Sequence, residues 1–97
     1  MTIVGNVCIT SIDHRYEEVG KSVLDQGIKV TDTKIGDGCF IGFGAIIQAG
    51  TTLGKHCVVG ANAVVRGDFP NYSVIAGVPA KIIKRYNLKT EKWERVI

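Results

Sequence analysis

The sequence is poor in the features that staple or anchor a small protein. It contains three cysteines, Cys8, Cys39 and Cys57, and no C-x-x-C pair, so neither a zinc knuckle nor a dithiol redox motif is indicated. Its longest apolar runs are about three residues, far below the roughly 18 that a membrane helix needs. The first residues lack a basic segment followed by an apolar one, so no signal peptide is predicted. Together these absences predict a reduced, cytoplasmic protein without a membrane span.

Other absences exclude several function classes. There are two prolines and no Gly-X-Y period, which rules out collagen although 12 of the 97 residues are glycine. The net charge is +3, but neither a dense basic stripe nor a nucleic-acid-binding motif is present, so no nucleic-acid partner is expected. The two histidines are too few for a three-histidine zinc site, and no metal is predicted.

What the sequence does contain is a six-residue repeat. Large aliphatic residues recur at every sixth position, at Ile35, Ile41, Ile47, Leu53, Val59 and Val65. Glycine follows four of them, and small residues stand four positions after the first five, at Cys39, Ala45, Thr51, Cys57 and Ala63, before Phe69 breaks that column. This period fits neither an α-helix nor an alternating hairpin strand. It predicts short strands joined by tight corners, with aliphatic side chains pointing inward and glycines relieving the corners.

Three hexapeptides would make one turn of 18 residues, which can be checked in the sequence. Residues 18 apart should stack about 4.8 Å apart, and like then stacks on like, as for Ile35 with Leu53 and Ile41 with Val59. Cys39 stacks on Cys57 in this register. We interpret both as small corner-filling residues and not as a disulfide, which is the less favoured alternative.

Two segments resemble a known family. Residues 35–47, Ile-Gly-Asp-Gly-Cys-Phe-Ile-Gly-Phe-Gly-Ala-Ile-Ile, resemble the hexapeptide-repeat acyltransferases, and residues 75–81, Ile-Ala-Gly-Val-Pro-Ala-Lys, are similar to their closing segment. Asp13-His14, followed by Gln26-Gly27, is similar to the loop and re-entry of the O-acetyltransferase branch, which includes galactoside, maltose and capsular-sugar acetyltransferases.

The resemblance implies an all-β fold, a left-handed parallel β-helix in the form of a triangular prism. We expect a single domain over residues 1–97, with regular hexads over 35–66, a protruding loop near 13–26 and a short C-terminal tail over 81–97. Residues 1–12 read as a short strand without a clean hexad register, and residues 66–72 as a break that lengthens the spacing to Ile75. Because family members usually carry further residues before this point, we expect that N-terminal coils are missing. The conformation of the tail is left open between helix and strand.

The resemblance also implies chemistry. His14 matches the catalytic histidine of the acetyltransferases, and a neutral imidazole can take the proton of an acceptor hydroxyl as it attacks a thioester. Transfer would be direct, with a backbone N–H near Gly42 as donor to the oxyanion. Asp13 or Glu17 is a candidate for orienting the imidazole, and each is equally readable as plain loop charge. His56 is interpreted as a solvated corner residue.

Acetyl-CoA is the implied co-substrate, and its groove maps onto six positions of this sequence. They are Gly42, Phe43, Ala61, Arg66, Lys81 and Lys84. Small residues permit the approach of the pantetheine arm, and the basic residues suit phosphates. The alternative for Lys81 and Lys84 is a solvated face of the tail.

The outward positions of Phe40, Phe43 and Ile46 would leave apolar surface on a single prism. The resemblance implies a homotrimer with active sites between subunits and a hydroxylated sugar or glycan as acceptor. The rival hypothesis is a non-catalytic trimerisation remnant or a truncated piece of such an enzyme.

Overall fold

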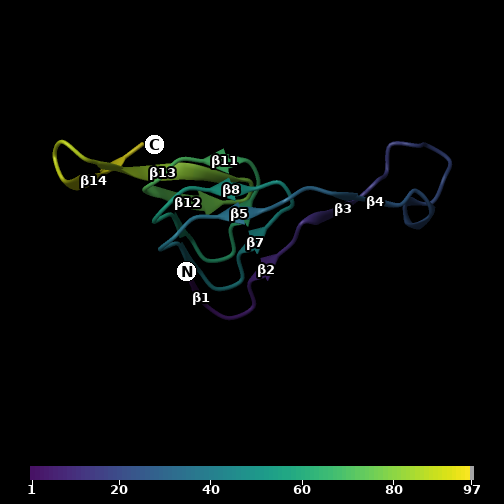
Figure 1. Cartoon of the computed structure of the whole chain (residues 1–97), viewed down its shortest axis with the longest axis horizontal. Helices are drawn as coiled ribbons and strands as arrows, with labels where there is room; N and C mark the ends of the chain where they lie inside the picture. Colours follow the sequence, from purple (N-terminus) through teal and green to yellow (C-terminus); the bar gives the residue numbers. More distant parts are fainter. Residues whose placement is uncertain (97) are drawn as a thin grey trace.

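A computed structural model describes residues 1–96 as an elongated molecule of 54 × 25 × 20 Å (Figure 1). Its centre is a stack of short parallel strands, from which an arm and a hairpin extend in opposite directions. Ile97, the last residue of the expected tail, lies outside the described residues.

The parallel strands form three sheets, each one face of a prism. The first face consists of β1 (Thr2–Ile3), β6 (Phe40–Ile41), β9 (Val58–Val59) and β12 (Ser73–Gly77). The second face consists of β2 (Cys8–Ile9), β7 (Ile46–Ile47) and β10 (Val64–Val65). The third face consists of β5 (Lys34–Ile35), β8 (Thr52–Leu53) and β11 (Asp68–Phe69). Read along the chain, coil 1 is β1, β2 and β5, coil 2 is β6, β7 and β8, and coil 3 is β9, β10 and β11.

The interior of the prism is the aliphatic column that the repeat predicted. Ile41, Ile47 and Val59 are completely buried, and each lies in register with its neighbour one coil away. Burying a side chain of this size stabilises a fold by about 1.5–3 kcal/mol, and the column repeats that gain on every face. Cys39 and Cys57 are buried beside it, and each thiol donates to a backbone carbonyl of the next coil. The corner-filling role expected for both cysteines is confirmed.

The repeat begins earlier than the sequence indicated. Ile3 pairs with Ile41 and Ile9 pairs with Ile47, so residues 1–9 already have hexad register. The expectation of no clean register there was wrong. It failed because a long insertion separates Ile9 from Ile35 in the sequence. The two residues occupy successive inward positions of the same coil, but they are not six positions apart.

That insertion is an arm, not only a loop. It contains β3 (Ile12–His14), the 3-10 turn η1 (Val23–Asp25) and β4 (Ile28–Val30). β3 and β4 pair antiparallel and carry the tip away from the prism (Figure 1). The arm leaves and rejoins coil 1 at the edge between the second and third faces, which we call the second edge.

Coil 3 is shorter than a regular turn. Phe69 follows Val65 by four residues and pairs with Leu53, so it takes the inward position and does not break the core. Ile75 then pairs with Val59, only 16 positions earlier. The expectation that residues 66–72 lengthen the spacing was therefore wrong, because Gly67, with φ of 119°, lets the chain turn the corner in fewer residues.

The tail is a strand and a hairpin. β13 (Ala80–Asn87) reverses after β12 and pairs antiparallel with it, and β14 (Lys92–Arg95) pairs antiparallel with β13. Both extend the first face and project beyond the prism (Figure 1). The backbone N–H and C=O groups at the open edge of β12 are thereby paired with β13, which explains why a strand forms here.

Candidate functional site

The arm that carries His14 is built by its own hydrogen bonds. His14 is the cross-strand partner of Ile28, and the Arg15 amide donates to the Gly27 carbonyl at 3.1 Å. At the tip, the Gln26 side chain donates to the carbonyls of Glu18 and Lys21, and it accepts from the Glu18 amide. One side chain therefore closes the tip, which explains why a charged segment without hexads keeps a defined shape.

His14 and Asp13 point to opposite sides of β3. Successive residues of a strand alternate, and directly opposed residues of an antiparallel pair share a side. Asp13 opposes Lys29, whereas His14 opposes Ile28. His14 is exposed and Asp13 is half-buried.

The two carboxylates considered as partners of His14 are engaged elsewhere. Asp13 accepts a hydrogen bond from the guanidinium of Arg66, in an ion pair between the arm and the prism. Glu17 accepts from the Tyr16 amide at 3.0 Å, and the backbone N–H groups of Glu17 and Tyr16 lower the pKa of its carboxyl group. Within residues 1–96, neither carboxylate forms a hydrogen bond or ion pair with the imidazole.

A hollow of about 360 Å³ lies beside His14. Its walls come from the arm and from the second edge of the prism, and they include Tyr16, Lys29 and Arg66. Tyr16 and Lys29 were missed by the sequence analysis. Only the register of β3 with β4, which places Lys29 opposite Asp13, could have indicated the lysine.

Gly42, Phe43 and Ala61 lie together on another edge, between the first and second faces, which we call the first edge. A side chain at Gly42 would approach the Val59 carbonyl to 2.8 Å and the Ala61 amide to 2.9 Å. The Phe43 ring instead lies over Gly5 of coil 1. The Gly42 amide already donates to Val59 at 2.9 Å, so it is not an available oxyanion donor.

Two other amides on the first edge remain available. Within residues 1–96, neither Phe43 nor Ala61 donates its backbone N–H to a protein acceptor. They occupy the same corner of successive coils, because Gly42 and Gly60 occupy equivalent hexad positions. A row of outward N–H groups of this kind can donate hydrogen bonds to carbonyl oxygens of an extended ligand.

The two lysines of the tail lie apart from each other. Lys81 opposes Ala76, whose side chain lies near Gly60, so it is close to the first edge. Lys84 opposes Val74 on one side and Arg95 on the other, and it lines a hollow of about 730 Å³ with Trp93. The structure thus groups Lys81 with Gly42, Phe43 and Ala61, and it separates Arg66 and Lys84 from them.

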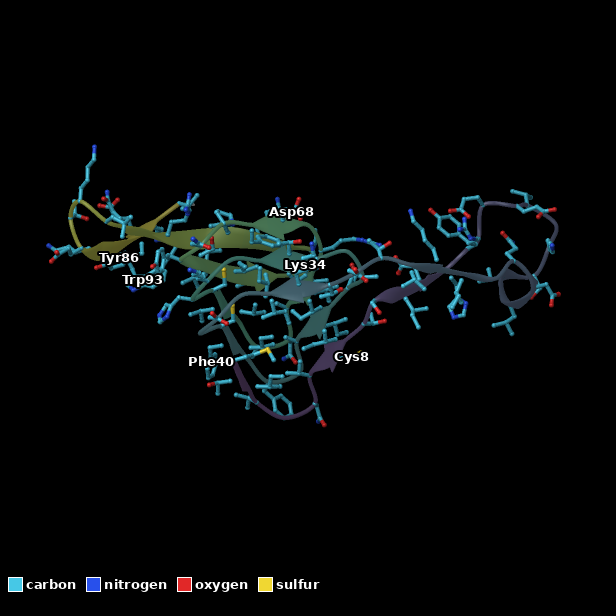
Figure 2. All side chains as sticks on the ribbon, viewed as in Figure 1. Cys8, Lys34, Phe40, Asp68, Tyr86 and Trp93 are labelled. Atoms are coloured by element: carbon cyan, nitrogen blue, oxygen red, sulfur yellow. The ribbon has the colours of Figure 1, made fainter. Side chains whose placement is uncertain are left out.

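The edge between the third and first faces, which we call the third edge, carries an aromatic cluster. The cluster consists of His56, Tyr72, Tyr86 and Trp93. Trp93 stacks on His56 with ring centroids 6.2 Å apart and meets Tyr86 edge-on at 5.3 Å. Figure 2 labels Tyr86 and Trp93 where the hairpin leaves the prism. His56 is exposed, as expected of a corner residue, but it also anchors the hairpin, which the sequence did not indicate.

Two further findings concern the described residues as a set. Residues 1–96 hold no group of three or more His, Cys, Asp or Glu side chains placed to bind a metal ion. No helix in that part of the chain has the length and apolar content needed to span a membrane. The cytoplasmic location stays a prediction.

Comparisons with known proteins agree with this architecture. Residues 32–67 match the family model described as bacterial transferase hexapeptide (six repeats). The chain is 41% identical over 86 residues to the acetyltransferase Rv3034c of Mycobacterium tuberculosis, covering 89% of this chain and 28% of that protein. It is 52% identical over 61 residues to the lipopolysaccharide biosynthesis O-acetyl transferase WbbJ of Escherichia coli, covering 63% of this chain and 31% of that protein. The names of both relatives mark their activity as inferred.

A solved structure has the same fold. The galactoside acetyltransferase in complex with coenzyme A superimposes with a TM-score of 0.73 and 30% identity, over 87% of this chain and 41% of that one. The fold is therefore the left-handed parallel β-helix found in hexapeptide-repeat acetyltransferases, and residues 32–67 carry that family's repeat. It spans about a third of the length of the curated relatives that it matches.

Proposed function

We propose that this chain acts in an acetyl-CoA-dependent O-acetyltransferase that modifies a hydroxyl group of a sugar or glycan. The observation that carries the proposal is the arm, which presents His14 beside a hollow at the prism surface. Support for the class comes from the relatives, which include an O-acetyl transferase of lipopolysaccharide biosynthesis and a galactoside acetyltransferase bound to coenzyme A.

His14 is the general base in this proposal. An acceptor hydroxyl is a poor nucleophile at neutral pH, and the neutral imidazole takes its proton as the oxygen attacks the thioester carbonyl. The tetrahedral intermediate collapses with departure of the CoA thiolate, which receives that proton. The acetyl group passes directly to the acceptor, so no protein nucleophile is needed.

The first edge supplies the acetyl-CoA side of the site. The amides of Phe43 and Ala61 donate hydrogen bonds to carbonyl oxygens of the pantetheine arm in this proposal. Gly42 lets the two coils stack closely at this edge, because the next coil leaves no room for a side chain there. Lys81 lies above the same edge and suits a CoA phosphate as a point charge. Arg66 and Lys84, the other basic residues of the predicted set, lie away from this edge, Arg66 beside Asp13 and Lys84 beside Trp93. The oxyanion donor expected near Gly42 is not the Gly42 amide itself, because that amide already donates to the Val59 carbonyl.

A second copy of the chain is required to complete the site. His14 belongs to the second edge and Gly42 to the first, so one prism does not bring the base and the groove together. Packing of prisms side by side as a homotrimer would place the arm of one subunit against the first edge of its neighbour. Apolar side chains exposed on the first and second faces, including Phe40 and Ile46, suit such packing.

The test compares His14→Ala with the unchanged protein by measuring release of free CoA from acetyl-CoA in the presence of a panel of sugars. We expect turnover to fall by about 10²–10⁴-fold, the usual contribution of a general base. His56→Ala is the matched control, because it removes the other histidine at a position outside the proposed site. Full turnover in the His14→Ala protein would remove the assigned base.

Calorimetric titration with CoA separates the enzyme from the remnant hypothesis. A folded protein that binds CoA supports the proposed groove. A folded trimer that binds no CoA would instead favour a non-catalytic assembly role.

A further inference from the structure

We propose that Arg66 is a positioning residue, whose ion pair with Asp13 holds the arm against the prism and sets the direction of His14. The inference rests on the proposed function for its catalytic consequence. Its structural part, a tethered arm, stands independently of any activity.

The arm has few attachments to the prism. Its root is fixed to coil 2 by the Gly50 amide, which donates to the Thr31 carbonyl at 3.2 Å, and by the Thr33 hydroxyl, which donates to the Gln48 carbonyl at 3.3 Å. Beyond the root, within residues 1–96, the Asp13–Arg66 pair is the one hydrogen bond or ion pair between the arm and the prism. A strand pair of three residues per strand with so little support is easily displaced.

The pair reaches across the stack. Arg66 directly follows β10 of coil 3, whereas Asp13 leaves from coil 1, and the two residues are 53 positions apart in the sequence. The guanidinium therefore spans the level of coil 2 and draws the arm along the second edge. The Arg66 side chain is 55% exposed and that of Asp13 is 37% exposed, so the contact is a surface pair with a modest energy.

The direction of His14 follows from strand alternation. Asp13 and Lys29 share one side of the β3–β4 pair, and His14 lies on the other. When Arg66 holds the side of the strand pair that carries Asp13, the orientation of the opposite side, which carries the imidazole, is fixed as well.

This role differs from binding of a CoA phosphate, which the sequence alone predicted for Arg66. A phosphate contact would affect the KM for acetyl-CoA and would not involve Asp13. Loss of a positioning role lowers kcat, and loss of either Asp13 or Arg66 should lower it equally. An ion pair of reversed polarity at the same two positions should preserve the role.

The experiment combines Asp13→Asn, Arg66→Ala, the double variant and the exchanged pair Asp13→Arg with Arg66→Asp. Hydrogen exchange of the arm amides, residues 12–30, should accelerate about two- to five-fold in either single variant, the range expected for an exposed pair. The double variant should be no faster than the singles, and the exchanged pair should recover slow exchange. Lys21→Ala, which breaks the exposed Lys21–Glu18 pair at the tip, is the control and should leave β3 exchange unchanged.

Kinetics on the same proteins address the catalytic consequence. We expect kcat to fall by a similar factor in both single variants, with the KM for acetyl-CoA unchanged and kcat restored by the exchanged pair. Unchanged exchange in the arm, or a raised KM in Arg66→Ala alone, would overturn the proposal. If the unchanged protein turns over no sugar, the proposed function fails, and the exchange data still decide whether the arm is tethered.

Discussion

At the scale of single residues, the structure separates two uses of glycine that look alike in the sequence. Gly38 has φ of 72° and turns a corner, as His56 does at the same hexad position with φ of 52°. Gly42 has no such angle, but a side chain there would press on the backbone of the next coil. The repeat indicated that glycines relieve the corners, and it could not tell backbone angle from close approach, because only the stacked neighbours decide this.

Gly42→Ala tests the close approach. The added methyl would approach backbone atoms of Val59 and Ala61, which cannot move independently, so we expect a loss of about 1–3 kcal/mol in the free energy of unfolding. Gly5→Ala is the control at the same corner of coil 1, where the nearest atom is the edge of the Phe43 ring at 3.3 Å. Denaturant unfolding of both proteins measures the difference, and equal losses would contradict the argument.

The buried thiols give a second prediction. Burial raises the pKa of the Cys57 thiol, and the exposed Cys8 is the accessible one of the three cysteines. A thiol reagent should modify one group per folded chain, and Cys8→Ser should abolish that reaction. Because folding raises the pKa of the Cys57 thiol, the contribution of this thiol to the free energy of unfolding is fully present below the ordinary thiol pKa. That contribution is lost as the pH rises through the raised pKa. Rapid modification of all three thiols under native conditions would contradict the buried positions.

At the scale of elements, the repeat predicted the strands of coil 2 and the strands β9 and β10 of coil 3 well, but it missed β11 and the appendages. Ile41, Ile47 and Val59 carry a regular signal because the same inward position recurs in each coil. The arm and the hairpin have no such constraint. Their shape depends on Gln26 closing the tip and on Trp93 packing against His56, and neither contact follows a repeating pattern in the sequence. His14 was found through a family resemblance, whereas its neighbour Lys29 had no signal of its own.

Trp93→Ala should detach the hairpin from the third edge. It removes the stack on His56 and the edge-on contact with Tyr86, and aromatic pairs of this kind contribute about 0.5–1.5 kcal/mol beyond the area that they bury. We expect faster hydrogen exchange in β13 and β14 with unchanged exchange in β6 and β7. Leu88→Ala, at the exposed turn of the hairpin, is the control. Equal protection of β14 in both variants would show that the strand pairing alone holds the hairpin.

At the scale of the whole molecule, a single prism leaves apolar surface uncovered. Phe40, Phe43 and Ile46 are 41%, 50% and 40% exposed, although each stands on a face or edge of the central stack. Figure 2 shows Phe40 on the outer surface of the prism. The three-fold assembly is an inference from this surface and from the separation of His14 and Gly42, and neither the repeat nor the fold of one chain fixes the number of copies.

Light scattering of the purified protein should give a mass close to three times the 10.5 kDa of one chain. Ile46→Lys, which places a charge on the apolar face, should lower that mass toward the monomer, whereas Lys89→Glu at the hairpin turn should not. A trimer that persists in Ile46→Lys would place the contact on another face.

The arm departs from coil 1 and returns to it at neighbouring points, joined by the hydrogen bond from Thr31 to Ser11. The segment between them can therefore change in length or composition while Ile9 and Ile35 keep their places in the stack. Evolution, or a protein engineer, can treat it as an exchangeable cassette. Under the proposed function, swapping arms among related prisms would test whether this segment selects the acceptor hydroxyl.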